Sequence, residues 1–377
     1  MIVSLDRADA GVPAFLADLE ALVTLESPSN SPELLLRSAE AIALLGERYL
    51  GQRPDTIDAG STTHLRWRLG SGPRRILILT HHDTVWPEGT LATIPWSAHH
   101  GVIRGPGCFD MKFGIVQALA ALAALPEELR DGVTLLVTGD EEIGSPSSRQ
   151  LIEDEAQGCV AALVLESAGP GGALKTARKG VANYELVAEG RAAHAGLEPE
   201  RGVNAAVEIA HQVLSLAAVG DAAQGTTVTP TVVAAGTTSN TVPASARVSI
   251  DSRATSIAEQ ERVDAALRRL APALPGSALR LDGGINRPPL EASRSVGLAL
   301  LAAEVAVELG IPVPGTIAVG GASDGNFTAA LGVNTLDGLG AVGGGAHAAD
   351  EHVVMACIAE RVALLAGLIE RLAAEES

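Results

Sequence analysis

The chain has 377 residues, of which 47% are apolar and only 2% aromatic, so it can bury large cores of small side chains and should form two domains. Its formal net charge of −18 excludes the broad basic surface that nucleic acids and anionic membranes require as partners. The three cysteines are widely spaced, and neither a secretory signal pattern nor a membrane-spanning apolar run is visible, so a cytoplasmic location is expected.

The first half of the chain alternates between helix-like and strand-like segments. Apolar residues recur at three- and four-residue spacing over residues 12–50, which predicts helices. Strands and helices then alternate, with strands predicted at 74–80, 132–138 and 159–166 and helices at 112–125 and 147–156. This order indicates an α/β domain in which helices cover a mostly parallel sheet.

A different order of elements begins near residue 177. The pattern predicts strand, helix, strand, strand, helix and strand at 181–190, 202–218, 227–236, 244–254, 257–274 and 278–285. This β-α-β-β-α-β order is typical of a ferredoxin-like unit. Helices predicted at 295–310 and 358–372 return to the first pattern, so we expect an α/β domain of residues 1–176 and 287–377 with a second domain inserted at 177–286.

Acidic and histidine side chains gather where the predicted strands end. In chain order they are His81, Asp83, Asp110, Glu141, Glu142 and Glu166. Each alone has an ordinary explanation, such as a solvated acidic pair or a helix cap, but ligands bind at the carboxyl ends of such strands, and crowded acids need a cation there. Carboxylates and imidazole without thiolates suit a catalytic Zn²⁺ site, with Co²⁺ or Mn²⁺ as alternatives.

Six motifs occur in order over nearly the whole chain: "HHDTV", "GPGCFDMKFG", "TGDEEIGS", "VLES", "AAHAGLEPERGVNA" and "GAHAADE". The set resembles the dinuclear-zinc exopeptidase and deacylase superfamily, which includes aminoacylase, peptidase T and succinyl-diaminopimelate desuccinylase. Within it, the likeness is greatest to the bacterial folate-hydrolysing glutamate carboxypeptidases. The resemblance implies a zinc-exopeptidase-like catalytic domain with an inserted lid or dimerisation domain. It also implies a pair of zinc ions per chain, held by His81, Asp110, Glu142, Glu166 and His347.

The same resemblance assigns further roles. Glu141 would be the general base, and Asp83 would orient the ring of His81. His194 of the inserted domain would stabilise the oxyanion in the active site of a partner subunit, which implies a homodimer. Residues expected to bind the carboxylate and carbonyl groups of the substrate, a task suited to the planar fork of arginine, are Asn240, Arg253 and Arg287.

The remaining histidines near these motifs are not expected to bind metal. His82 is the variable middle residue of the H-x-D motif, and His99 and His100 lie in a predicted loop. His352 lies five residues after His347 and is a rival ligand, but the motif favours His347.

The expected function is that of a zinc-dependent amide hydrolase, a carboxypeptidase that releases a C-terminal amino acid, glutamate-like or other, from a small N-acyl or short peptide substrate. The sequence around Lys175 does not align cleanly with the glutamate-specific relatives, so the resemblance leaves the released amino acid open. An N-acyl-amino-acid deacylase is the first alternative. A non-catalytic binding protein of the same fold is the distant alternative, because every residue expected to bind metal is present.

Overall fold

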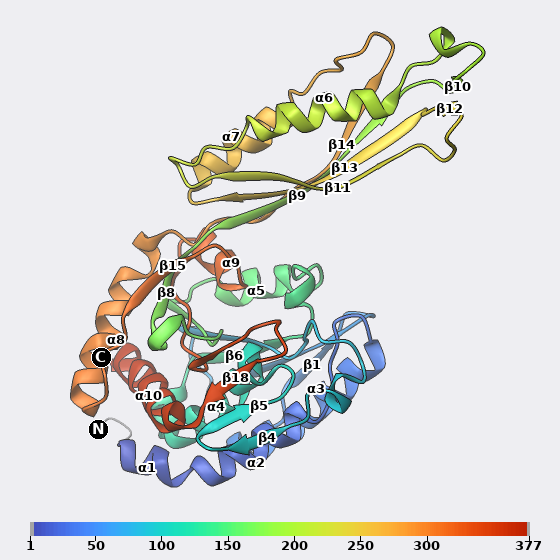
Figure 1. Cartoon of the computed structure of the whole chain (residues 1–377). Coiled ribbons are helices and arrows are strands. Elements are labelled where there is room, and N and C mark those ends of the chain that lie inside the picture. The colour runs from blue at the N-terminus through green and yellow to red at the C-terminus, as the bar shows by residue number, and fades with distance from the viewer. Residues whose placement is uncertain (1–3, 375–377) are drawn as a thin grey trace. The chain divides into compact units, whose positions relative to one another are not determined.

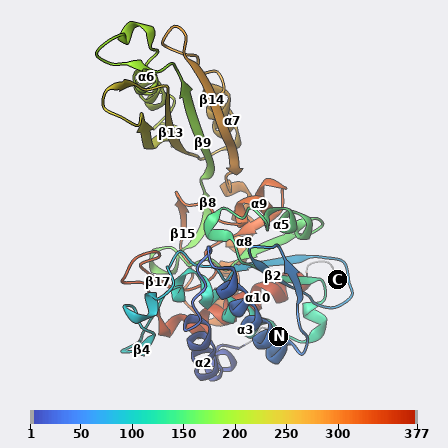
Figure 2. The same ribbon diagram turned by 90° about the vertical axis from the view of Figure 1, so that its right-hand side faces the viewer.

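The structure is a computed structural model that describes residues 4–374. Its contacts divide the chain into two compact units. Unit 1 contains the residues up to Ala177, Glu291–Val319 and the residues from Ser323 onward, and unit 2 contains Arg178–Leu290 with Gly320–Ala322. Figure 1 and Figure 2 show the elements of both units in two views.

The sheet of unit 1 is mixed, with a parallel centre. Its six strands lie in the order β1 (Asp55–Asp58), β2 (Thr63–Arg68), β6 (Val133–Thr138), β3 (Ile76–His81), β7 (Ala161–Val164) and β16 (Asn334–Leu336). Strands β6, β3, β7 and β16 run parallel, whereas β1 and β2 are antiparallel to their neighbours. The mostly parallel α/β architecture predicted from the sequence is therefore confirmed.

Strand β3 shows why this sheet must be covered on both faces. Every residue of β3 is buried. Ile76 and Ile78 belong to one apolar cluster, and Leu77 and Leu79 belong to another on the opposite face. A run that is apolar on both faces is the pattern of a central parallel strand.

Helices cover the two faces unequally. The first cluster packs against α2 (Val12–Val23), α3 (Pro32–Leu50), α4 (Phe113–Ala124), α8 (Val296–Leu309) and α10 (Ile358–Ala374), and the second packs against α5 (Arg149–Ala156) and α9 (Gly325–Ala330). The short helix α1 (Leu5–Ala10) contributes Ala8 to the first cluster.

Two smaller sheets complete unit 1. One contains β17 (Gly343–Gly344), β18 (His352–Val354), β5 (Val102–Arg104) and β4 (Ser97–His99) in that order, and the other pairs β15 (Thr316–Val319) with β8 (Leu174–Arg178). The short strands of the first sheet were not recognised from the sequence, because segments of two or three residues carry no periodicity.

Unit 2 has the predicted β-α-β-β-α-β order. Its main elements are β9 (Gly180–Glu189), α6 (Ala205–Ala217), β11 (Thr227–Ala235), β13 (Ser245–Ala254), α7 (Ile257–Leu267) and β14 (Ala278–Arg287), with the short pair β10 (Ala193–His194) and β12 (Thr241–Val242). The antiparallel sheet has the order β11-β13-β9-β14. Alternate residues of β9, such as Tyr184 and Leu186, are buried in the cluster that includes residues of α6 and α7.

The three cysteines, Cys108, Cys159 and Cys357, are free thiols. None of the helices formed by residues 4–374 combines the length and the apolar character needed to cross a lipid bilayer.

Candidate metal centre

The order of the strands brings the predicted residues together. β6, β3 and β7 are parallel neighbours, so their carboxyl ends meet at one edge of the sheet. His81 is the last residue of β3, Glu141 and Glu142 lie in the turn after β6, and Glu166 follows β7 by two residues. This edge is where open α/β sheets bind their ligands.

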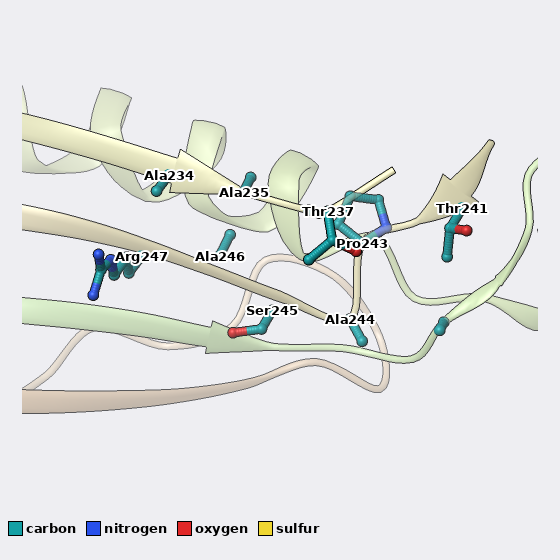
Figure 3. Close-up of a pocket in the computed structure, with 11 residues that line it drawn as sticks. Ala234, Ala235, Thr237, Thr241, Pro243, Ala244, Ser245, Ala246 and Arg247 are labelled. Carbon is teal, nitrogen blue, oxygen red and sulfur yellow. The ribbon is translucent and has the colours of Figure 1, made fainter. Parts of the chain in front are cut away.

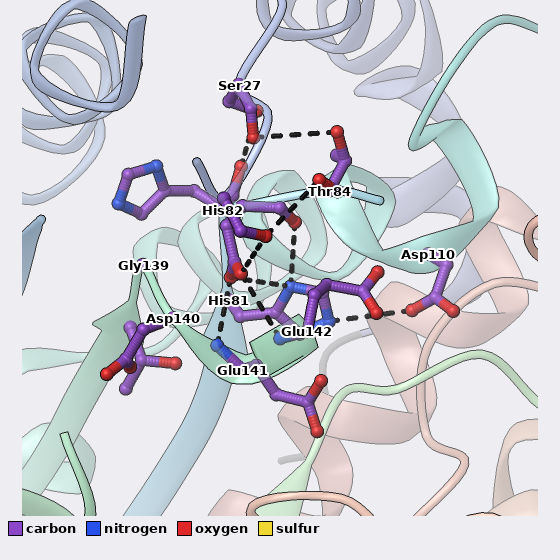
Figure 4. Close-up of polar contacts among 12 residues, drawn as sticks. Ser27, His81, His82, Thr84, Asp110, Gly139, Asp140, Glu141 and Glu142 are labelled. Carbon is purple, nitrogen blue, oxygen red and sulfur yellow. Dashed lines mark hydrogen bonds and ion pairs between the residues drawn. The ribbon is translucent and has the colours of Figure 1, made fainter. Parts of the chain in front are cut away.

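A first group of ligand atoms surrounds the ring of His81. Its Nε2 atom lies 3.5 Å from Oδ1 of Asp110 and 3.4 Å from Oε1 of Glu166. In Figure 4, Asp110 and Glu142 lie beside the His81 ring, and a dashed line marks the contact between this ring and Asp110. Ligand atoms of His81, Glu141 and Glu166 also lie within 4.8 Å of one another.

A second group shares Asp110 with the first. Nε2 of His347 lies 3.4 Å from Oδ2 of Asp110 and 3.3 Å from Oε2 of Glu142. The two carboxylate oxygens of Asp110 therefore face different histidines. A carboxylate placed in this way can bridge a pair of divalent ions, the arrangement of two-metal hydrolytic sites.

The hydrogen bonds of His81 show that its buried nitrogen suits a cation. Nδ1 lies 3.0 Å from the backbone carbonyl of Asp83, and because a carbonyl only accepts, Nδ1 carries the proton. Nε2 then presents a lone pair toward carboxylates, and it has no hydrogen-bond partner although it is buried. Oε1 of Glu142 is likewise buried without a partner. Acceptor atoms that face one another in a buried site need a cation between them, so these groups fit a metal ion.

The electrostatics point to the same demand for positive charge. Burial lowers the pKa of His81, but contacts with Asp110, Asp83 and Glu166 outweigh it and hold the pKa well above its ordinary value. The carboxylates of Asp110 and Glu142 raise the pKa of His347 to about 10. In a site without a metal ion, protons on these histidines would supply the missing positive charge, and a bound cation reverses that preference.

Asp83, which was predicted to orient the ring of His81, also holds the turn that carries Glu141 and Glu142. Its Oδ1 atom lies 3.4 Å from Nδ1 of His81, but the hydrogen bond of that ring goes to the Asp83 carbonyl. The fully buried carboxylate accepts the backbone N–H groups of Glu141 and Glu142, both at 3.1 Å, and the Ser29 hydroxyl at 2.8 Å. Asp83 therefore connects the end of β3 to the turn that carries Glu141.

The other histidines lie outside these two ligand groups, and His99, which was predicted in a loop, is the last residue of β4. His82 is fully buried, with Nδ1 3.2 Å from the Ser38 hydroxyl and Nε2 2.9 Å from the Thr63 carbonyl. Figure 4 shows its ring turned away from Asp110 and Glu142. His99 and His100 are exposed, and Nδ1 of His352 lies 2.9 Å from the Asp350 carbonyl.

Two buried carboxylates that hold the ligand loops were missed by the sequence analysis. Asp140 accepts four hydrogen bonds from Ser147 and Ser148. Glu351 accepts four, three from the backbone of residues 107–110 and one from the indole of Trp86. In the sequence, both acids resemble solvated surface residues. Their only signal is their position, one residue before Glu141 and four residues after His347.

The four candidate residues of unit 2 occupy two separate regions. His194 pairs with Thr241, and the N–H of Ala195 donates to the Asn240 carbonyl at 2.9 Å, so His194 and Asn240 are neighbours. Arg253 and Arg287 lie at the other end of the sheet, where each is opposite Val181. Because β13 spans ten residues, the two ends are separated by roughly 30 Å.

The two arginines differ in their surroundings. Arg253 makes a two-pronged ion pair with Asp251 on the same strand, with Nε and Nη2 each 2.9 Å from a carboxylate oxygen. Arg287 is buried, and its backbone carbonyl accepts the side-chain amide of Gln260 at 2.9 Å. The chain enters and leaves unit 2 at this end, where Arg178 and Leu290 form paired backbone hydrogen bonds of 3.0 Å.

A cavity of about 480 Å³ lies at the other end of unit 2, beside β12. Figure 3 shows residues that line it, including Thr241, Pro243 and Arg247. Arg247 is the one titratable side chain in this lining. The candidate chemistry therefore belongs to the edge of the sheet in unit 1.

Comparisons with known proteins agree with this geometry. Carboxypeptidase G2 of Pseudomonas sp. (strain RS-16) is 31% identical, over 96% of this chain and 90% of that protein. Succinyl-diaminopimelate desuccinylase of Methylorubrum populi is 25% identical, over 92% and 96% of the two chains. The solved structure of the M20 family metallo-carboxypeptidase Sso-CP2 from Sulfolobus solfataricus shares the fold, with a TM-score of 0.76, 17% identity and coverage of 95% and 99%.

The family itself is shown by a match over most of the chain. Residues 77–371 match the sequence profile of peptidase family M20/M25/M40. This span includes every residue of the candidate metal centre, from His81 to His347. The resemblance inferred from the ordered motifs is confirmed, and the protein is a metallo-hydrolase of peptidase family M20/M25/M40.

Proposed function

We propose that the protein is a carboxypeptidase that hydrolyses the amide bond between a C-terminal amino acid and an N-acyl or peptidyl group. The observation that carries the proposal is the pair of ligand groups around His81 and His347, which share Asp110 and have Glu141 beside them. The likeness to carboxypeptidase G2 over nearly the whole chain supports the carboxypeptidase assignment.

The residues present fit two divalent ions. His81, Asp110 and Glu166 would hold one ion, and His347, Asp110 and Glu142 would hold the other. Nitrogen and oxygen donors without sulfur suit Zn²⁺, with Co²⁺ or Mn²⁺ as alternatives. When bound, the ions would polarise the amide carbonyl and make water acidic enough to react at neutral pH.

Glu141 is the residue proposed to move the proton. Its backbone N–H is held by Asp83, and its carboxylate lies within 4.8 Å of ligand atoms of His81 and Glu166. A carboxylate at this position can take a proton from the attacking water and pass it to the nitrogen that leaves. Only 8% of Glu141 is exposed, which limits competition from bulk water.

Unit 2 is proposed to supply substrate contacts and the dimer. Asn240, Arg253 and Arg287 would bind the carboxylate and carbonyl groups of the substrate, and His194 would stabilise the oxyanion in the site of a partner subunit. The wide separation of His194 and Arg253 within one unit supports a homodimer, because one copy of unit 2 cannot bring both to one small substrate. A cytoplasmic location is also proposed, supported by the free cysteines.

The second candidate function is N-acyl-amino-acid deacylation, favoured by the likeness to succinyl-diaminopimelate desuccinylase. Both functions use the same chemistry at the metal centre. They differ in which side of the amide bond is recognised, so substrates rather than catalytic variants separate them.

The test is a substrate panel assayed with zinc-reconstituted protein and with the matched variant Glu141→Gln. The panel pairs N-acyl amino acids and dipeptides that have a free C-terminal carboxylate with the same compounds as C-terminal amides. We expect hydrolysis of free acids only, and a loss of turnover of about 100-fold or more in the variant. Equal hydrolysis of the blocked compounds would contradict the carboxypeptidase proposal, and normal turnover by metal-loaded Glu141→Gln would contradict the role of Glu141.

A further inference from the structure

Glu351 is a fully buried acid surrounded by N–H donors. Its Oε1 atom accepts the backbone N–H of Phe109 at 2.9 Å and that of Asp110 at 3.1 Å. Its Oε2 atom accepts the backbone N–H of Gly107 at 2.9 Å and the indole N–H of Trp86 at 2.8 Å. A buried carboxylate is costly unless such bonds satisfy it, so this one needs all of its neighbours in place.

These four hydrogen bonds connect three segments of the candidate metal centre. Trp86 follows the segment with His81 and Asp83, the backbone of residues 107–110 carries the shared acid Asp110, and Glu351 lies four residues after His347.

The backbone between His347 and Glu351 forms a tight turn that fixes the position of one residue relative to the other. The N–H of Glu351 donates to the carbonyl of Ala348, and the N–H of Ala348 donates to that of Gly345, both at 2.9 Å. A Cβ atom on Gly345 would come within 2.7 Å of the Glu351 nitrogen, and this glycine has a φ of +76°. The side chain of Glu351 is therefore held in a fixed relation to His347.

We propose that Glu351 is a positioning residue that locks the Asp110 segment to the His347 loop and so sets the spacing of the two metal positions. The inference rests on the proposed function, because it assumes that Asp110 and His347 bind metal. Glu351 itself is not one of the proposed metal ligands. It acts through the backbone N–H of Asp110, the residue whose two carboxylate oxygens face the two histidines.

The donor pattern dictates which substitution is informative. Both carboxylate oxygens face donors only, so an amide group would direct its own N–H groups at two donors in either orientation. Glu351→Gln therefore removes two hydrogen bonds while it preserves the volume of the side chain. Glu351→Asp keeps two acceptor oxygens but withdraws them by one methylene, so it should disturb the segment less.

Glu208 offers a matched control in unit 2. It is also fully buried, and it accepts the backbone N–H groups of Ala273 and Leu274 and the hydroxyl of Ser277. Glu208→Gln changes the same kind of buried acceptor in the unit that holds none of the proposed metal ligands. Any general effect of neutralising a buried glutamate should appear in both variants.

The experiment measures zinc affinity by competition with a chelator, together with kcat and KM of the zinc-loaded dimer. For Glu351→Gln we expect zinc affinity and kcat to fall by about 10- to 100-fold, the usual cost of losing a residue that orients ligands. KM should change by less than about threefold, because the substrate contacts are untouched. The zinc affinity and kcat of Glu351→Asp should lie between those of the wild type and of Glu351→Gln. Glu208→Gln should keep wild-type zinc affinity and kcat.

Two results would overturn the proposal. One is zinc affinity within about twofold of wild type in Glu351→Gln, or in Glu351→Asp if the Gln variant does not fold. The other is an equal loss of zinc affinity in Glu208→Gln. Because chelator competition needs no substrate, a protein that binds zinc as expected but cleaves no amide would contradict the proposed function and leave this inference standing.

Discussion

Replacing Asp140 tests how much this buried carboxylate contributes to holding the turn that carries Glu141 and Glu142, beside the hydrogen bonds that Asp83 accepts from the same turn. Asp140 is 1% exposed, and its Oδ2 atom accepts the backbone N–H of Ser147 at 2.7 Å, its hydroxyl at 2.6 Å and the N–H of Ser148 at 3.2 Å. Its Oδ1 atom accepts the Ser148 hydroxyl at 2.5 Å. These contacts close a loop of residues directly after β6.

The structure sets the expected size of the effect. Asp140→Ala leaves the N–H groups of Ser147 and Ser148 without their acceptor, and each unsatisfied buried group costs about 1–3 kcal/mol. The two hydroxyls can turn to other acceptors, so we expect the free energy of unfolding to fall by about 3 kcal/mol.

Asp140→Asn should be milder because one orientation satisfies every partner. The amide oxygen can take the place of Oδ2 and accept three hydrogen bonds, while the NH₂ group donates to the Ser148 hydroxyl, which can rotate. The charge-assisted bonds weaken, but the cost of burying a charge disappears. We expect a loss of about 1 kcal/mol.

The assay is urea unfolding of metal-free protein followed by tryptophan fluorescence. All three tryptophans, Trp67, Trp86 and Trp96, belong to unit 1, so the signal reports the unit that contains Asp140. In the zinc-loaded protein, Asp140→Ala should also lower kcat more than Asp140→Asn does, because the turn that positions Glu141 loosens. Equal destabilisation by Asn and Ala, or a loss below about 1 kcal/mol in Ala, would refute this reasoning.

Three further outcomes are expected. Metal analysis of reconstituted protein should approach about two divalent ions per chain, and a firm value of one would contradict the shared role of Asp110. His194→Ala and Glu141→Gln should each be nearly inactive, yet mixing the two variants should restore part of the activity if a dimer shares its sites; no recovery from folded, metal-loaded parents would argue against this. Burial raises the pKa of Glu208, but its hydrogen bonds outweigh this and lower the pKa from 4.5 to about 2, so its stabilisation of unit 2 is complete above pH 4.5 and is lost as the pH falls toward 2. Glu208→Gln should remove that dependence, measured as the unfolding midpoint by circular dichroism against pH, and an unchanged acid dependence would assign it to other groups.

Local patterns in the sequence determined the elements and most of the candidate ligands. The run Ile76–Leu79 is apolar on both faces, and such a run predicts a central parallel strand with its polar residues at the end. The β-α-β-β-α-β order of unit 2 was equally visible, because helix and strand periodicities are properties of neighbouring residues. The ordered motifs predicted the family, which the match over residues 77–371 confirms.

Only the tertiary structure decided how these residues meet. The sheet order β6-β3-β7 places Glu142 and Glu166 on either side of His81, and the fold brings His347 to the second oxygen of Asp110. The role of Glu351 was hidden because three of its four partners are backbone N–H groups more than 240 residues earlier, and every residue except proline has such a group. A sequence names its side chains, but the burial of one carboxylate among distant backbone donors exists only once the chain has folded.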